Sequence, residues 1–167
     1  MRQDLVFVGG PPGVGKTTTC TELGRILPDS IWVDADDLWC RMNPFRADDV
    51  TIPMIERNIV AVLGNFLDAG FRHVVLCWVL HRREIIDGLL AGLADRQFRF
   101  HSYTLVCDET VLKDRWELTH KEGSGFGQAV VRLEQLRALP HTMFVDTSDM
   151  TAVQAASVIA GRFSQPG

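Results

Sequence analysis

The chain has 167 residues, which is enough for one domain with its own hydrophobic core. Hydrophobic residues make up 46% and charged residues 23%, and the net charge of −4 argues against a nucleic-acid or membrane-surface protein. No apolar signal region precedes the first apolar run and no stretch reaches the ~20 apolar residues of a membrane span, so we expect a cytoplasmic protein.

Five short apolar runs predict the strands of a sheet. The runs are continuous rather than alternating, which is typical of parallel strands with helices on both faces. In chain order they are Leu5–Val8, Ile31–Val33, His73–Val79, Phe100–Val106 and Met143–Val145.

Helical patterns fill the intervals between these runs. The clearest lies between Ile52 and Ala69, where apolar residues form one stripe at helical spacing and Gly70 follows as a stop signal. Alternating strands and helices predict a single α/β sandwich over residues 1–167, with right-handed crossovers. The other predicted helices are Lys16–Ile26, Arg82–Ala94, Glu109–His120, Gln128–Leu139 and Met150–Phe163, the last with Thr147, Ser148 and Asp149 as candidate N-caps.

The first strand is followed by a segment that fits G-x-x-x-x-G-K-[ST], the phosphate-binding P-loop. Its glycines allow backbone N–H groups to point at phosphate, and the next helix adds its positive N-terminal end. Lys16 can reach the β- and γ-phosphates of ATP, and the Thr17 hydroxyl can bind Mg²⁺. The predicted nucleotide-binding residues are Gly10, Pro11, Pro12, Gly13, Val14, Gly15, Lys16, Thr17 and Thr18.

Three carboxylates follow the second predicted strand, close to the P-loop at the carboxyl edge of the sheet. Asp34 is suited to the metal ion, acting through water, and Asp36 to an attacking hydroxyl group as a general base or orienting acceptor. Asp37 is expected to cap the following helix. The structural alternative is that these acids only cap the N-terminus of the following helix, where its dipole favours negative charge.

The third predicted strand ends without a second acid, which strengthens the assignment of Asp34 to the metal. Trp78 and His81 lie at this strand end, where they either line an acceptor pocket or act as a core tryptophan and a surface histidine. The four cysteines, at positions 20, 40, 77 and 107, form no C-x-x-C pair, so we expect buried reduced thiols rather than a zinc or redox site.

Three arginines are candidate ligands of anionic groups. Arg115 begins a glycine-rich segment, a predicted lid at about 116–130, and can neutralise phosphate or stack on a base. Arg132 follows the lid tip and Arg57 belongs to a predicted acceptor-binding insertion at about 37–72. Each has a structural alternative, namely a solvated surface arginine or, for Arg115, an ion pair on the helix.

These motifs in this order resemble the small-molecule branch of the P-loop kinases. The branch includes shikimate and gluconate kinases, nucleoside monophosphate kinases, and antibiotic-related members such as chloramphenicol phosphotransferase and the tunicamycin-resistance proteins. The region from Thr104 to Phe163 is most similar to the tunicamycin-resistance type. The resemblance implies a five-stranded parallel sheet in the order 2-3-1-4-5.

The resemblance also implies roles for particular residues. Asp36 corresponds to the acid that faces the acceptor hydroxyl, Arg115 to the arginine on the adenine, and Asp146-Thr147 to the adenine-edge loop. Arg57 and Arg132 correspond more weakly to acceptor-binding arginines. Lys16, Asp36 and Arg115 are therefore the candidate catalytic residues.

Departures from the family pattern limit the choice of substrate. Cys77-Trp-Val replaces the three glycines of shikimate kinases, which argues against shikimate. The lid has only His120 and Lys121 as candidate cations, and the chain contains no N-K-x-D guanine motif. We expect transfer of the γ-phosphate of Mg-ATP to a hydroxyl of a metabolite, nucleoside or antibiotic. A nucleoside monophosphate kinase and a regulatory ATPase without an acceptor are the alternatives.

Overall fold

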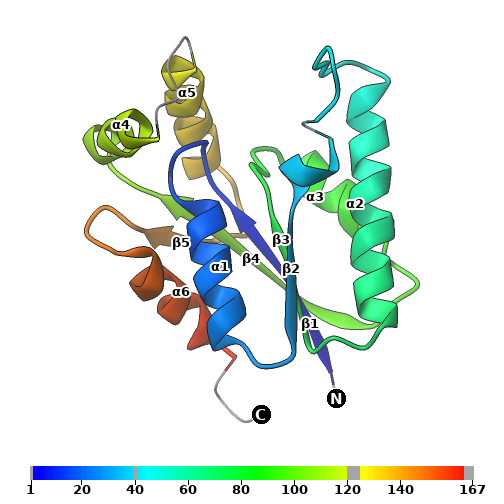
Figure 1. The fold of residues 1–167 in the computed structure, drawn as a ribbon. Coiled ribbons are helices and arrows are strands. Elements are labelled where there is room, and N and C mark those ends of the chain that lie inside the picture. The colour runs from blue at the N-terminus through cyan, green and yellow to red at the C-terminus, as the bar shows by residue number, and fades with distance from the viewer. Residues whose placement is uncertain (1, 40, 120–124, 164–167) are drawn as a thin grey trace.

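The computed structural model describes residues 2–39, 41–119 and 125–163 and contains a five-stranded parallel sheet (Figure 1). The strands lie in the order β2-β3-β1-β4-β5, which confirms the predicted sheet order and the α/β sandwich. Their bounds are β1 (Gln3–Gly9), β2 (Ser30–Asp34), β3 (His73–Cys77), β4 (Phe98–Val106) and β5 (Met143–Asp146).

Helices cover both faces of this sheet. On one face α1 and α6 pack beside each other, with α4 and α5 above them, and on the other face lie α2 and α3 (Figure 1). The bounds are α1 (Lys16–Ile26), the short 3-10 helix η1 (Ala35–Leu38), α2 (Thr51–Asp68), α3 (Arg83–Ala91), α4 (Glu109–Leu118), α5 (Phe126–Arg137) and α6 (Ala152–Ala160).

Alternate residues of the central strand supply the two halves of the core. Leu5 and Phe7 pack with α2 and α3, whereas Val6 and Val8 pack with α1 and α6, and all four are fully buried. A strand sends successive side chains to opposite faces, so a strand covered on both faces must be apolar throughout. This burial holds the carboxyl end of β1, and the loop that follows it, in a fixed position.

Helix caps differ from the sequence-based expectation. Asp34, rather than Asp37, caps η1, since its Oδ1 accepts a hydrogen bond of 3.1 Å from the Asp36 backbone N–H. Thr151 caps α6 in a capping box with Gln154, so the expected caps at residues 147–149 are wrong. In both places the cap is the residue whose side-chain oxygen accepts a hydrogen bond from a backbone N–H in the first turn of the helix.

No helix within the described ranges combines the length and the apolar character that a membrane span requires.

Candidate active site

The P-loop lies at the carboxyl end of β1 and leads directly into α1. Gly13 and Gly15 have φ angles of 86° and 102°, in the left-handed region that residues with a side chain rarely adopt. Gly15 is the N-cap of α1. The Lys16 ammonium donates a hydrogen bond of 3.1 Å to the Pro11 carbonyl oxygen, so the lysine folds back across its own loop.

Asp34 and Thr17 meet where β2 ends beside the P-loop. The Thr17 hydroxyl donates a hydrogen bond of 2.8 Å to Asp34 Oδ2, and the Cys77 thiol lies 3.6 Å from the same oxygen. Cys77 is opposite Asp34 in the β2–β3 register, which explains this contact. The two residues predicted to bind metal are therefore in direct contact.

The P-loop and the acids of β2 and η1 line one cavity of about 230 Å³, which we call the central cavity. Asp36 is exposed to solvent, whereas Asp34 is half-buried. No cluster of three or more His, Cys, Asp or Glu side chains able to hold a metal occurs among the residues described. The central cavity is lined by Pro12, Gly13, Gly15, Lys16, Thr17, Thr18, Asp34, Asp36, Val79 and Thr119.

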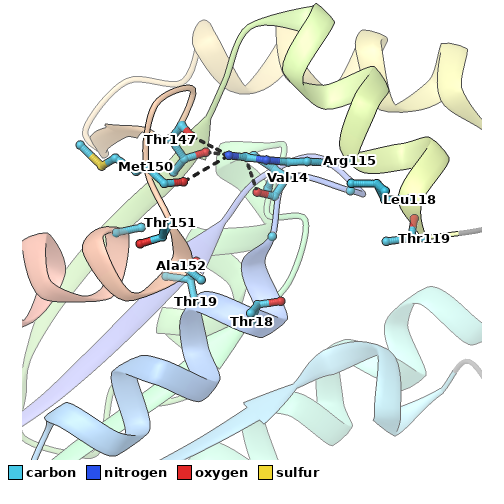
Figure 2. A pocket seen from close by; sticks show the side chains of 13 residues that line it. Val14, Thr18, Thr19, Arg115, Leu118, Thr119, Thr147, Met150, Thr151 and Ala152 are labelled. Atoms are coloured by element: carbon cyan, nitrogen blue, oxygen red, sulfur yellow. Dashed lines mark hydrogen bonds between the residues drawn. The ribbon is translucent and has the colours of Figure 1, made fainter.

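A second cavity of about 360 Å³ lies beside α1 and is shown in Figure 2; we call it the Arg115 cavity. The Arg115 guanidinium donates hydrogen bonds to the carbonyl oxygens of Val14, Thr147 and Met150 and to the Thr147 hydroxyl, at 2.6 to 3.4 Å. Arg115 thus joins the P-loop to the segment between β5 and α6, rather than pairing with a glutamate on its own helix among the described residues.

Of the predicted adenine-edge pair, Thr147 lines the Arg115 cavity and is buried. Asp146 is not among the lining residues. Its Oδ1 accepts hydrogen bonds from the Ser148 hydroxyl (2.7 Å) and backbone N–H (2.9 Å), and these bonds lower the pKa of Asp146. Asp146 therefore holds the loop in shape, while Thr147 presents its surface to the cavity.

A third cavity, of about 520 Å³, lies between η1, α2, α5 and the end of β3; we call it the tryptophan cavity. It shares Asp36 and Val79 with the central cavity, so the two cavities adjoin at these residues. Trp78 and His81 both line it, which supports the pocket interpretation of this strand end. The lining residues are Asp36, Trp39, Ala47, Ile52, Glu56, Trp78, Val79, Leu80, His81, Arg82, Ile85, Arg132 and Gln135.

The structure separates the two arginines that the sequence assigned to an acceptor. Arg132 lines the tryptophan cavity, whereas Arg57 is exposed on α2 and does not line it. Its neighbour Glu56 occupies that side of the cavity instead. Arg82 also lines the cavity and was not predicted, although its place in the connection between a predicted strand and the next helix was a usable signal.

Burial lowers the pKa of two basic residues that line the tryptophan cavity, His81 and Arg132. Desolvation, with the nearby charges of Arg132 and Arg82, lowers the pKa of His81 from 6.5 to about 4. Desolvation and the charge of Arg82 also lower the pKa of Arg132. His81 is therefore neutral at pH 7, and the two arginines supply the positive charge.

The candidate lid is described only in part. Trp116 packs against the P-loop, and a Cβ on Gly13 would lie 3.1 Å from its ring. His120 and Lys121, the candidate lid cations, lie outside the described residues.

The model of one known family, described as an AAA domain (AAA_18), matches residues 6–126, which include the P-loop, the acids and Arg115. The chain belongs to this AAA-domain family. No curated protein matches the sequence.

Solved structures show that this AAA-domain protein has the fold of the small-molecule P-loop kinases. The tunicamycin resistance protein of Deinococcus radiodurans has a TM-score of 0.77 at 24% identity, covering 99% of this chain and 98% of that one. A gluconokinase from Sinorhizobium meliloti 1021 has a TM-score of 0.71 at 18% identity, with 98% and 95% covered. The Mycobacterium tuberculosis APS kinase, solved with AMPPNP and APS, has a TM-score of 0.67 at 16% identity, with 98% and 99% covered.

Proposed function

We propose that this protein is an ATP-dependent phosphotransferase that moves the γ-phosphate to a hydroxyl group of a small molecule. The observation that carries the proposal is the position of Asp36, which lines both the central cavity and the tryptophan cavity. A carboxylate at the junction of a P-loop and a second cavity can contact a hydroxyl group there. A regulatory ATPase has no need of the second cavity.

The P-loop side would hold the donor. Backbone N–H groups and Lys16 would bind the β- and γ-phosphates, and the adenine would enter the Arg115 cavity beside Thr147. Thr17 and Asp34 offer adjacent oxygen atoms of the kind that Mg²⁺ prefers, and Mg²⁺ would neutralise phosphate charge when bound. Because the guanidinium of Arg115 is bonded to backbone carbonyls, we assign it a positioning role.

In the transfer step the acceptor oxygen forms a bond to the γ-phosphorus while the bond from that phosphorus to the β–γ bridging oxygen breaks. ADP leaves with the electron pair of the broken bond, and the hydroxyl proton passes to the Asp36 carboxylate. Asp36 is exposed and lines both cavities, so its carboxylate is accessible to a hydroxyl group bound there. Alignment of the two substrates on either side of Asp36 would supply most of the rate enhancement.

Acceptor-dependent ADP release tests this function. The wild-type protein with Mg-ATP is offered hydroxylated metabolites, nucleosides and antibiotics, the last because of the tunicamycin resistance protein among similar structures. At least one compound should raise ADP release and yield a phosphoester in equal amount, detected by phosphorus NMR. Lys16→Ala should abolish both. ADP and inorganic phosphate formed at one rate, whatever is added, would indicate a regulatory ATPase instead.

A further inference from the structure

One wall of the tryptophan cavity is aromatic. Trp39 and Trp78 meet edge to face, with ring centroids 6.5 Å apart and an interplanar angle of 88°. The Phe45 ring also contacts Trp39, with ring centroids 5.2 Å apart. Two rings at right angles form an apolar corner in which a planar ring can stack on one indole and meet the other with its edge, a fit that a flexible polyol does not offer.

Arg82 and Arg132 form the basic side of this cavity. Arg82 and Arg132 are close enough for the charge of Arg82 to affect Arg132. Arg132 donates a hydrogen bond of 2.7 Å to the neutral Gln135 amide oxygen. Within the described ranges neither arginine forms an ion pair with a carboxylate. Two neighbouring guanidinium groups without an acid form a site that an anion would stabilise.

His81 lines the same cavity as these arginines and the two tryptophans. It is neutral at pH 7, so it adds no repulsive charge and can exchange hydrogen bonds with a ligand. His81 Nδ1 and Trp39 Nε1 are buried polar atoms that have no hydrogen-bond partner among the described residues. Unpaired buried polar atoms are rare, and both occur in residues that line this one cavity.

The acids of the cavity come from other elements. Asp36 lies on η1 and Glu56 on α2, whereas the basic residues follow β3 or lie on α5. Asp36 also lines the central cavity, whereas Arg82 and Arg132 do not. The cavity therefore has an acidic side that meets the P-loop at Asp36 and a basic side formed by the two arginines.

On the premise of the proposed phosphotransferase function, we propose that the acceptor is an anionic compound built on a planar ring. The ring would lie against Trp39 and Trp78, and its carboxylate or phosphate group would bind Arg82 and Arg132. The hydroxyl to be phosphorylated would then lie at the acidic side, beside Asp36. The cavity volume of about 520 Å³ suits a ring with a few substituents. Neither arginine lines the central cavity, which makes the phosphates of ATP the less suitable partner.

Calorimetric titration of the intact chain, with and without AMPPNP, tests this assignment. The probes are matched pairs that differ in one anionic group: uridine 5′-monophosphate with uridine, and 3-phenyllactate with its neutral amide. Inorganic phosphate and glycerate serve as anions without a ring. In at least one pair the ringed anion should bind at least about tenfold more tightly than its neutral partner and than either ringless anion, because a charge-assisted bidentate contact has that magnitude.

Arg82→Gln and Arg132→Gln should each remove about tenfold of the anion's affinity and leave the neutral partner unchanged. Arg83→Gln is the matched control, since Arg83 is exposed and pairs with Asp87 on α3 at 3.1 Å. The inference is overturned if no ringed anion binds more tightly than its neutral partner, or if both cavity variants weaken AMPPNP alone.

The same titrations separate the inference from the function on which it rests. Ringed anions that bind through Arg82 and Arg132 but are never phosphorylated would contradict the phosphotransferase and leave the site assignment standing. A neutral hydroxyl compound that is phosphorylated as fast in Arg82→Gln as in the wild type would support the phosphotransferase and contradict the site assignment.

Discussion

At the residue scale, Gly13 is where the P-loop meets α4. An added Cβ would lie 3.1 Å from Trp116 Cε3, and the φ angle of 86° disfavours any side chain. We expect Gly13→Ala to displace the loop and lower ATP affinity by about tenfold or more, since the left-handed conformation alone costs about 1–2 kcal/mol. Titration with a fluorescent ATP analogue measures the change.

Gly88→Ala is the control for this substitution. Gly88 lies inside α3, has an ordinary φ angle, and an added Cβ would have no neighbour within 4 Å. ATP affinity should stay the same, and the helix should gain stability of up to about 1 kcal/mol. Equal ATP affinity in Gly13→Ala and the wild type would show that the loop tolerates a side chain.

The sequence predicted which residues line a cavity where a local motif fixes the backbone. It did not predict this where the orientation of a side chain depends on how a helix packs on the sheet. The P-loop, Asp34 and Asp36 gather around one cavity as their spacing indicated. Arg57 was predicted from its place off the apolar stripe of α2, but that criterion does not distinguish a cavity from open solvent. Glu56 and Arg82 line the tryptophan cavity because of how α2 and α3 meet the sheet, which no local pattern encodes.

At the element scale, Arg115 connects α4 to the P-loop and to the segment before α6 (Figure 2). Lysine has one ammonium group in place of the planar fork and cannot make all of these contacts at once. We expect Arg115→Lys to loosen the Arg115 cavity and lower ATP affinity about tenfold, with little effect on acceptor binding. Calorimetry with AMPPNP and with the acceptor gives the two affinities separately.

Lys113→Gln, on the exposed side of the same helix, is the control, and it removes a positive charge that Arg115→Lys keeps. It should bind ATP as the wild type does. Should Arg115→Lys reduce turnover at saturating ATP while its ATP affinity is normal, Arg115 would act on the reacting phosphate and our positioning role would be wrong.

Elements themselves were largely predictable, because each has a continuous apolar surface. The bounds of α1 match those expected, and α2 shifts by one residue at each end. The predicted third strand was too long, since β3 ends at Cys77 and Leu80 takes a positive φ of 48°. Apolar residues continue through this turn because they line the tryptophan cavity, so hydrophobicity alone could not locate the strand end.

At the scale of the whole molecule, a charged cluster joins three strands at the end of the sheet opposite the P-loop. Asp4 on β1 is fully buried and accepts two hydrogen bonds of 2.8 Å from Arg99 and one of 2.9 Å from His101 on β4. His73 on β3 lies 3.8 Å away. Burial acts to raise the pKa of Asp4, but the bonds from Arg99 and His101 outweigh it and lower the pKa.

Because the folded-state pKa of Asp4 is below its ordinary value of 3.8, its contribution to stability is complete above pH 3.8. That contribution should disappear as the pH falls through the lowered value. Asp4→Asn should reduce the free energy of unfolding by about 1–3 kcal/mol at pH 7 and less at the acid end. Urea unfolding across this pH range measures both effects.

Asp87→Asn serves as the control, because Asp87 is exposed and pairs with Arg83 at 3.1 Å on the surface of α3. Its unfolding curves should follow the wild type at every pH. A difference between Asp4→Asn and the wild type that stays constant down to the acid end would show that the Asp4 carboxylate is not the titrating group.

In the proposed reaction Asp36 contacts the acceptor hydroxyl where the donor and acceptor cavities adjoin. The most direct measurement compares acceptor-stimulated with basal ADP release in Asp36→Asn and in Asp37→Asn, an adjacent exposed acid that pairs with Arg41 at 3.4 Å. We predict that Asp36→Asn loses at least about a hundredfold of the stimulated rate and keeps its ATP affinity, as expected for a lost general base, while Asp37→Asn keeps both. Equal stimulation in the two variants would contradict the central claim.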